Sequence, residues 1–409
     1  MKLAPKFFIL AIGIVIAISF ASCSQTHKET QFPTADSNLS LPLSTSINTS
    51  QGTWAVFPMG DLSNHFNRFW QLFYQPPNSS SWTNLVKEVA TATNGGLSIT
   101  SNSTQTVVAI RPSFYLQFTP IISTRDQGST WSNGLLDHKL ATYPNSLALG
   151  SNNEALAVVD APGGNQVYAS TRNLDTWKFS IDLKKLKQLR GSRLCQPTKI
   201  TAVSYLGDTG IIGVDCSTPG MFGLYRYNGS AWQFSGGHLP SDLSNFRISV
   251  VGIDTVRSGA EVLLDNRSRN QVTLAVASIE SSQNFAYSMK WTTSHILSIN
   301  GKARLICLSP ISNGGFYVLD STRSGGTTLY QFSMPNSTLT KGIAPLGTWT
   351  VLSSPPIGTQ DVVSGSNSLP LAMQVNKTSL SIWSLNQTTR KWDLSQSSHV
   401  SIQFGSSNP

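Results

Sequence analysis

The chain has 409 residues, only 12% of them charged, and Ser, Thr, Asn and Gly are abundant. This composition favours short strands joined by many turns and argues against a protein built from long amphipathic helices. The 29 Lys and Arg residues exceed the 20 Asp and Glu residues, but the surplus is spread along the chain without an Arg-rich run, and no basic helix is expected. We therefore expect no nucleic-acid partner, and at most a weak attraction to anionic polymers.

The amino terminus has the pattern of a targeting segment. Lys2 and Lys6 precede the apolar run "FFILAIGIVIAISFA", which ends at Phe20-Ala21-Ser22-Cys23. These last four residues resemble the lipobox of bacterial lipoproteins, with Phe in place of the usual Leu. The resemblance implies that residues 1–22 are a signal peptide and that Cys23 is lipidated, which would anchor the protein outside the cytoplasm on the bacterial cell membrane. A plain secretory signal and an uncleaved anchor helix are the alternatives.

The following segment predicts a linker. Residues 23–51 are rich in Ser and Thr and nearly free of aromatic side chains, which is typical of a flexible tether. The folded domain is expected to occupy residues 52–409.

A repeat becomes visible when the tryptophans are aligned. Seven times, a β-rich run and a polar turn are followed by a Trp-bearing strand, at Trp82, Trp131, Trp177, Trp232, Trp291, Trp349 and Trp392. The successive intervals are 49, 46, 55, 59, 58 and 43 residues, a length that holds about four short strands and matches the blade of a β-propeller. The pattern predicts an all-β propeller of seven blades. The first blade lacks an obvious innermost strand, and the tail "HVSIQF" (399–404) is expected to supply it, so that N- and C-terminal strands close the ring.

The stretch "STRDQGSTW" (123–131) has the spacing Thr-x-Asp-x-Gly-x-Thr-Trp, in Thr124, Asp126, Gly128, Thr130 and Trp131. An Asp in a tight hairpin accepts backbone N–H bonds, and a Gly supplies positive φ, so these residues are expected to build a turn. A degenerate copy follows at 170–177, "STRNLDTW". On these motifs the chain resembles the Asp-box (BNR) repeat propellers of the sialidase-like superfamily. The six-bladed ring of sialidases is accordingly the alternative to seven blades.

The same resemblance raises the question of sialidase chemistry. Sialidases clamp a carboxylate with arginines, and Arg111 in "AIRPS" lies shortly before the Asp-box. However, none of the few glutamates forms a convincing set with Tyr and Arg, so no catalytic residue is assigned. The six histidines are scattered without metal-ligand spacing, and neither a metal nor a cofactor is expected.

Four successive blades share an Asp at the end of their predicted second strand: Asp160, Asp215, Asp265 and Asp320. Each Asp can simply stop its strand with an Asx-turn, which is the favoured interpretation. The alternative is a polar funnel for a ligand, made by these acids together with four arginines: Arg111, Arg267, Arg269 and Arg323.

The remaining cysteines suggest one pair. Cys195 and Cys216 flank a predicted hairpin, and an extracytoplasmic location would permit a disulfide between them. Cys307 alternates into an apolar strand and is expected to be a buried thiol.

These observations predict a lipid-anchored, extracytoplasmic monomer that acts as a non-catalytic binding or scaffold module. Its expected partners are the membrane, through the lipid, and an envelope protein or a glycan. The alternative is a divergent sialidase-like glycoside hydrolase or lyase that uses the Asp/Arg funnel.

Overall fold

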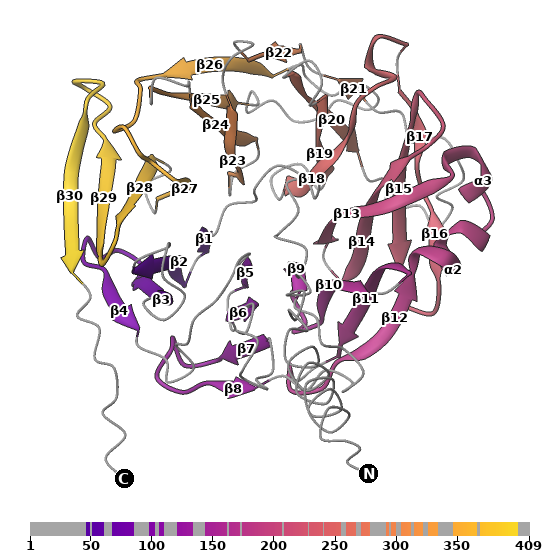
Figure 1. Cartoon of the computed structure of the whole chain (residues 1–409), viewed down its shortest axis with the longest axis horizontal. Helices are drawn as coiled ribbons and strands as arrows, with labels where there is room; N and C mark the ends of the chain where they lie inside the picture. Colours follow the sequence, from indigo (N-terminus) through magenta and orange to yellow (C-terminus); the bar gives the residue numbers. More distant parts are fainter. Residues whose placement is uncertain are drawn as a thin grey trace, which may run out of the picture. The chain divides into compact units, whose positions relative to one another are not determined.

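The computed structural model describes residues 46–49, 51–60, 68–85, 98–102, 106–109, 121–133, 144–161, 163–171, 174–206, 208–227, 229–239, 241–254, 259–266, 271–278, 292–293, 296–299, 304–311, 315–321, 326–333, 347–365 and 369–399. All of them belong to the compact unit Ser37–Pro409. Across these residues the chain is almost entirely β-structure, and the sheets follow one another around a ring (Figure 1). The fold is a β-propeller. None of the helices in the described ranges has the length and apolar character needed to cross a membrane.

The strands form seven separate antiparallel sheets, which we number as blades 1 to 7 in chain order. Blade 1 contains β1 (Ser46–Thr49), β2 (Gly52–Gly60), β3 (Arg68–Gln75) and β4 (Thr83–Leu85). Blade 2 contains β5 (Ser98–Ser101), β6 (Thr106–Ala109), β7 (Ile121–Thr124) and β8 (Ser132–Asn133). Blade 3 contains β9 (Pro144–Leu149), β10 (Ala155–Ala161), β11 (Gly164–Ser170) and β12 (Lys178–Asp182).

Blade 4 follows two short helices, α2 (Leu183–Gln188) and α3 (Ser192–Cys195), and has a fifth strand. Its strands are β13 (Pro197–Leu206), β14 (Thr209–Cys216), β15 (Met221–Tyr227), β16 (Trp232–Phe234) and β17 (Gly237–His238). The 3-10 helix η2 (Ser241–Leu243) leads into blade 5, whose strands are β18 (Arg247–Asp254), β19 (Gly259–Asn266), β20 (Gln271–Ser278), β21 (Thr292–Thr293) and β22 (Leu297–Ser298).

Blade 6 contains β23 (Arg304–Pro310), β24 (Phe316–Ser321), β25 (Thr327–Ser333) and β26 (Thr348–Leu352). Blade 7 contains β27 (Asp361–Ser364), β28 (Pro370–Asn376), β29 (Ser379–Leu385) and β30 (Trp392–His399). In every blade the first strand lies innermost and the last lies at the periphery, as Figure 1 shows.

The hydrophobic core lies between neighbouring blades. One cluster joins Leu156 and Val158 of blade 3 to Ile212 and Tyr225 of blade 4. Another joins Phe73 of blade 1 to blade 7. Because an inner strand is covered by a neighbour on both faces, its apolar residues need not alternate with polar ones, and β10 is buried throughout 155–159.

The blades are not all of one size. Six sheets contain at least one strand of seven residues or more, whereas the described strands of blade 2 have four, four, four and two residues. The prediction of a seven-bladed propeller is therefore corrected: the described residues form six extended sheets, and one further, short sheet carries the Asp-box.

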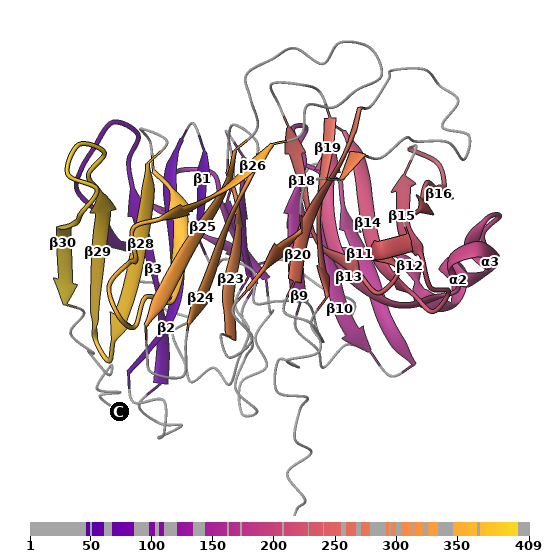
Figure 2. The ribbon, with the colours of Figure 1, turned by 90° about the horizontal axis from the view of Figure 1, so that it is seen from above.

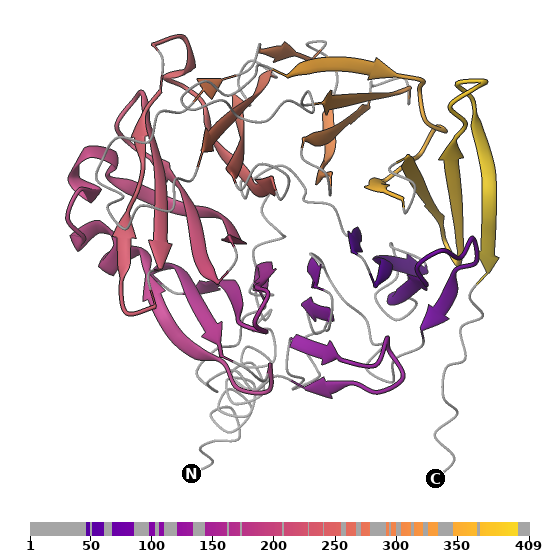
Figure 3. The same ribbon diagram turned by 180° about the vertical axis from the view of Figure 1, so that it is seen from behind.

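The predicted closure of the ring is wrong. β1 is the innermost strand of blade 1, and it comes from the segment that was expected to be a tether, so the folded domain begins earlier than residue 52. Blade 7 is made only of residues from 361 to 399, and no described sheet combines strands from both ends of the chain. Blades 1 and 7 instead meet side by side, as Figure 3 shows for the indigo and yellow strands. Ser46 Oγ donates to Asp361 Oδ2 at 2.8 Å across this contact. The tail 400–404 lies outside the described residues.

The tryptophans occupy equivalent places in the blades. In the six described examples, each Trp stands at or within one residue of the start of the outermost major strand, from Trp82 before β4 to Trp392 at the start of β30. Trp291 lies outside the described residues, although β21 begins immediately after it. The alignment of tryptophans therefore located the peripheral strand of each blade correctly.

A basic helix is present, contrary to expectation. α2 has the sequence LKKLKQ and buries Leu183 and Leu186, which lie three residues apart on one face. Asp182 caps its N-terminus by accepting the N–H of Lys185 at 2.7 Å.

Candidate functional site

The Asp-box forms a self-contained hairpin between β7 and β8. Asp126 accepts the backbone N–H of Thr130 at 2.8 Å and its hydroxyl at 2.5 Å. Thr124 Oγ1 in turn accepts the N–H of Gly128 at 2.9 Å, and Gly128 has a φ of 90° that favours glycine. The indole N–H of Trp131 donates to the carbonyl of Gly128 at 3.1 Å. The motif therefore builds a turn at the periphery of blade 2, as predicted.

The hydrogen bonds of this turn stabilise the charged form of its carboxylate. Bonds from Thr130, first from its side chain and then from its backbone, hold the pKa of Asp126 below its usual value. This carboxylate is occupied by the hairpin and is not poised for proton transfer.

The degenerate second motif keeps one element of this geometry. Trp177 Nε1 donates to the carbonyl of Leu174 at 2.8 Å, which repeats the bond from Trp131 to the residue three positions earlier. Trp232 differs, because its Nε1 donates to Ser180 Oγ of the preceding blade at 2.9 Å. At Trp232 a contact between blades thus replaces the hairpin contact.

Three of the four predicted funnel acids stand beside the start of an innermost strand. Asp215 is paired in register with Lys199, Asp265 with Arg247, and Asp320 with Leu305. Asp160 lies near the end of β10 and follows Val159, which pairs with Pro144 at the start of the innermost strand β9. The topology therefore places all four Asp residues at corresponding positions of successive blades.

Their burial argues for a structural role. Asp265 is 0% exposed and Asp320 is 1% exposed, so neither presents its carboxylate to solvent. Asp320 accepts the N–H of Thr328 at 3.1 Å and the hydroxyl of Tyr330 at 3.3 Å, both from β25 of its own blade. Burial raises the pKa of Asp320, an effect that these hydrogen bonds oppose. The arginines assigned to the funnel, Arg111, Arg267, Arg269 and Arg323, lie outside the described residues.

The predicted cysteine pair is present. Cys195 at the end of α3 and Cys216 at the end of β14 form a disulfide with a Cα–Cα distance of 4.7 Å. Cys23 lies outside the described residues, and the side chain of Cys307 is likewise not described.

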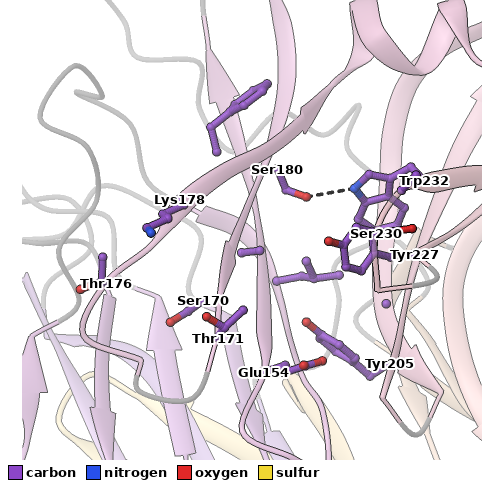
Figure 4. Close-up of a pocket in the computed structure, with 15 residues that line it drawn as sticks. Glu154, Ser170, Thr171, Thr176, Lys178, Ser180, Tyr205, Tyr227, Ser230 and Trp232 are labelled. Carbon is purple, nitrogen blue, oxygen red and sulfur yellow. Dashed lines mark hydrogen bonds between the residues drawn. The ribbon is translucent and has the colours of Figure 1, made fainter.

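A cavity of about 610 Å³ lies between blades 3 and 4 (Figure 4). Blade 3 contributes the start of β10 with the preceding Glu154, the end of β11 and the start of β12. Blade 4 contributes residues from each of its four main strands. Such a volume accommodates a small organic ligand. None of the residues predicted for a ligand site lines this cavity.

Aromatic side chains form much of the cavity wall. Tyr205, Tyr227 and Trp232 come from blade 4 and Phe179 comes from blade 3. The rings of Tyr227 and Trp232 are 5.3 Å apart, and the bond from Trp232 to Ser180 fixes the indole against the opposite wall (Figure 4). Gly210 also lines the cavity, and the absence of a side chain there allows the close approach of Leu156.

The polar groups of the cavity are one carboxylate, one ammonium group and a set of hydroxyls. Glu154 lies next to Tyr205 (Figure 4), and burial first, then the Glu154 charge, raise the pKa of that phenol well above its usual value. The phenol therefore stays protonated and can donate a hydrogen bond. Lys178 stands on the opposite wall. The hydroxyls belong to Ser170, Thr171, Thr176, Ser180 and Ser230.

One of these hydroxyls is unusual. Ser170 is 1% exposed, and its Oγ has no hydrogen-bond partner among the described residues. A buried hydroxyl without a partner costs free energy, and such groups call for an explanation when they occur in a native fold. Because Ser170 lines the cavity, a bound ligand could satisfy it.

Among the described residues that line the cavity, Glu154 is the single carboxylate. Glycoside hydrolysis ordinarily uses a pair of carboxylates. The described part of the chain also contains no group of three or more His, Cys, Asp or Glu residues that could hold a metal ion.

The sequence offered only an indirect signal for this cavity. Its aromatic residues alternate in strands next to the turns that carry Trp177 and Trp232, where each ring has the ordinary role of packing. The cavity lies where blade 3 packs against blade 4, and this long-range relation is not encoded in any local motif.

No protein-family model matches the chain, and no curated protein matches it either. Solved structures do. The chain superimposes on a proposed 6-phosphogluconolactonase from Bacteroides uniformis with a TM-score of 0.50 and 11% identity, over 86% of this chain and 97% of the other. The β-propeller domain of the Trilobed protease from Pyrococcus furiosus, described as having an open velcro topology, gives a TM-score of 0.49 and 7% identity over 87% and 98% of the two chains. YCF48 bound to D1 peptide gives a TM-score of 0.41 and 13% identity, over 82% of this chain and 94% of the other.

At 11% identity the likeness to the first of these structures concerns the fold alone, and it does not establish membership of the Asp-box or sialidase-like group. The assignment as a β-propeller rests on the topology of the described strands.

Proposed function

We propose that the protein is a non-catalytic glycan-binding module and that the cavity between blades 3 and 4 holds a saccharide unit. The observation that carries this proposal is the unpartnered hydroxyl of Ser170 in an aromatic-walled cavity.

The wall chemistry supports a saccharide. A sugar ring presents an apolar C–H face and a rim of hydroxyls, so it matches a site where aromatic rings stand beside hydrogen-bonding groups. Tyr227 and Trp232 offer the apolar surface, while Glu154 and Ser170 offer an acceptor and a hydroxyl. With one carboxylate in the cavity, binding is favoured over hydrolysis.

The cellular location remains part of the proposal. We infer from the lipobox-like residues 20–23 that Cys23 carries a lipid and that the propeller is held outside the membrane, where envelope glycans are accessible. An envelope protein as the partner is the competing possibility, and it would not require the cavity.

The test is a pair of matched serine variants. Ser170→Ala removes the cavity hydroxyl, and Ser364→Ala removes another hydroxyl that is 1% exposed and has no partner among the described residues, but lies in β27 of blade 7. The full chain in non-ionic detergent is screened against an array of oligosaccharides, and affinities are measured by calorimetry. Loss of one hydrogen bond predicts a weakening of about threefold to tenfold for Ser170→Ala, and none for Ser364→Ala.

Two results would contradict the proposal. One is the absence of any saccharide ligand. The other is a ligand whose affinity is unchanged by Ser170→Ala and by Tyr227→Ala, because binding would then occur elsewhere.

A further inference from the structure

A strongly basic surface lies next to the cavity. Residues 178–193 contain six Lys and Arg residues and a single acid, Asp182, which caps α2. All six basic residues are exposed: Lys178, Lys184, Lys185, Lys187, Arg190 and Arg193. We call these six residues the α2–α3 basic surface. Figure 2 shows α2 and α3 at the periphery of the ring, beside β12 and β15.

This surface is held rigidly against blade 4. Leu186 is buried, and Ser192 is 0% exposed, with its Oγ donating to the carbonyl of Leu186 at 2.6 Å. The same Oγ is 2.8 Å from the hydroxyl of Tyr225, and the disulfide between Cys195 and Cys216 fastens the end of α3. Basic side chains on a fixed support lose less conformational freedom when they bind a partner.

The basic surface is continuous with the cavity. Lys185 Nζ lies 4.8 Å from the centroid of the Phe179 ring, and Phe179 also lines the cavity. Lys178 belongs to both, because it is one of the six basic residues and stands on the cavity wall. A polymer with one unit in the cavity can therefore continue onto the basic side chains.

From this continuity we propose that the glycan is an anionic polysaccharide, with one unit in the cavity and its charged groups along the α2–α3 basic surface. This inference rests on the proposed function and adds the class of ligand. Six clustered basic side chains with a single acid among them attract a chain of repeated negative charges, and screening by salt makes this attraction strongest at low ionic strength. An anionic lipid bilayer is the other partner with suitable charge, since Phe179 and Leu194 are exposed nearby. The polysaccharide is favoured because it also accounts for the cavity.

The test uses two variants with the same change in net charge. One reverses three residues of the basic surface, Lys184→Glu, Lys187→Glu and Arg190→Glu. The control reverses three exposed basic residues of blade 7, Lys377→Glu, Arg390→Glu and Lys391→Glu. Full chains in non-ionic detergent are titrated with polygalacturonate, a polymer with one carboxylate per sugar, and with neutral dextran at several salt concentrations. Circular dichroism and thermal unfolding establish that both variants are folded.

The expected result is that polygalacturonate binds the unaltered chain in a salt-dependent manner and that reversal in the basic surface weakens binding by about tenfold or more. The blade 7 control should lose much less. No binding of polygalacturonate by the unaltered chain, or equal loss in both variants, would overturn the inference, because net charge alone would explain the second result.

Two further measurements distinguish failure of this inference from failure of the proposed function, and binding of a polysaccharide from binding of a membrane. If Ser170→Ala and Tyr227→Ala weaken the binding of neutral oligosaccharides, while the basic-surface variant binds polygalacturonate as tightly as the unaltered chain, the proposed function stands and the anionic class fails. If the basic-surface variant loses binding to phosphatidylglycerol vesicles relative to phosphatidylcholine vesicles, yet binds polygalacturonate normally, the surface serves a membrane and the inference is overturned. All variants share the same amino terminus, so differences between them report on the propeller.

Discussion

The side chain of Gln396 in the last blade binds both the backbone N–H and the backbone carbonyl of Trp82 in the first blade. Its Oε1 accepts the N–H of Trp82 at 2.8 Å, and its Nε2 donates to the carbonyl of Trp82 at 3.1 Å, across 314 residues of sequence. Blades 1 and 7 are therefore joined at the periphery by a side-chain amide and not by the pairing of two strands. The ring is held by such contacts and by the shared core of blades 1 and 7.

Replacing Gln396 should therefore weaken the closure. Gln396→Ala removes both hydrogen bonds to Trp82 and a third to Ser398 Oγ, and it leaves a partly buried N–H and C=O of Trp82 without this partner. We expect a loss of about 1 to 3 kcal/mol in the free energy of unfolding. Urea denaturation measures the change. Ser395→Ala, an exposed neighbour whose hydroxyl bonds only Ser384 within blade 7, is the control and should lose less. Equal stability of Gln396→Ala and the unaltered chain would contradict this view of the closure.

The closing contact also shows why the sequence analysis assigned residues 46–49 to the tether and not to the folded domain. β1 has the sequence SINT, which is too short and polar to distinguish from the Ser/Thr-rich segment before it. β1 pairs with β2 in a short hairpin, and its contacts with the last blade, Ser46 with Asp361 and Asn48 with Gly365, join residues more than 300 positions apart. By contrast, the hairpins of the blades are local, so the positions of Trp131, Trp177 and Trp232 could be predicted from the sequence.

The basic surface and the cavity differ in the same way, because one could be predicted from local sequence and the other could not. α2 has local signals, namely a capping Asp182 and leucines at 183 and 186, that could have predicted the helix and its basic outer face. The cavity has no such signal, because Ser170 and Tyr205 become neighbours only when two blades pack. The funnel acids were correctly placed at corresponding strand ends, but sequence does not distinguish a buried carboxylate such as Asp320 from a solvent-facing one.

The Asp-box provides a prediction for stability and its pH dependence. Asp126→Ala removes the acceptor for two groups of Thr130, and we expect a loss of about 1 kcal/mol with unchanged ligand affinity. Because the folded-state pKa of Asp126 is lowered, its contribution is fully present above the unfolded value of 3.8 and is lost as the pH falls through the folded value. The stability difference between the unaltered chain and Asp126→Ala should therefore shrink below about pH 4. Thermal unfolding from pH 7 to pH 2.5 measures this, and a difference that is constant over that range would contradict it.

The disulfide provides a prediction for the stability of the fold. Cys195 and Cys216 are separated by 21 residues, and loss of a cross-link of this span costs about 3 kcal/mol in the chain-entropy account. The double variant Cys195→Ala/Cys216→Ala should unfold at lower denaturant concentration than the unaltered chain, and reductant should lower the midpoint of the unaltered chain only. A midpoint that reductant does not change would show that the bond makes no contribution.

Lipidation provides a prediction for location. Cys23→Ala should move the expressed protein from the membrane fraction to the soluble extracytoplasmic fraction, because the thiol that accepts the lipid is absent. Cys307→Ala is the matched control and should remain with the membrane. Retention of Cys23→Ala in the membrane would favour an uncleaved anchor helix.

Gly210 allows the cavity to be filled without altering its polar groups. A Cβ at this position would lie 3.0 Å from Leu156 Cδ1 and 3.6 Å from Trp232 Cη2, so Gly210→Ala places a methyl group in the lining of the cavity. The nearest atom is the end of a flexible side chain, and we therefore expect the free energy of unfolding to change by only about 1 kcal/mol. One added methyl group in a fitted site should weaken the saccharide by about tenfold or more. Calorimetry on Gly210→Ala, with Ser364→Ala as the control, tests this. If Gly210→Ala is stably folded and binds the saccharide as tightly as the unaltered chain, the ligand does not reach Gly210 and the site between blades 3 and 4 is wrong.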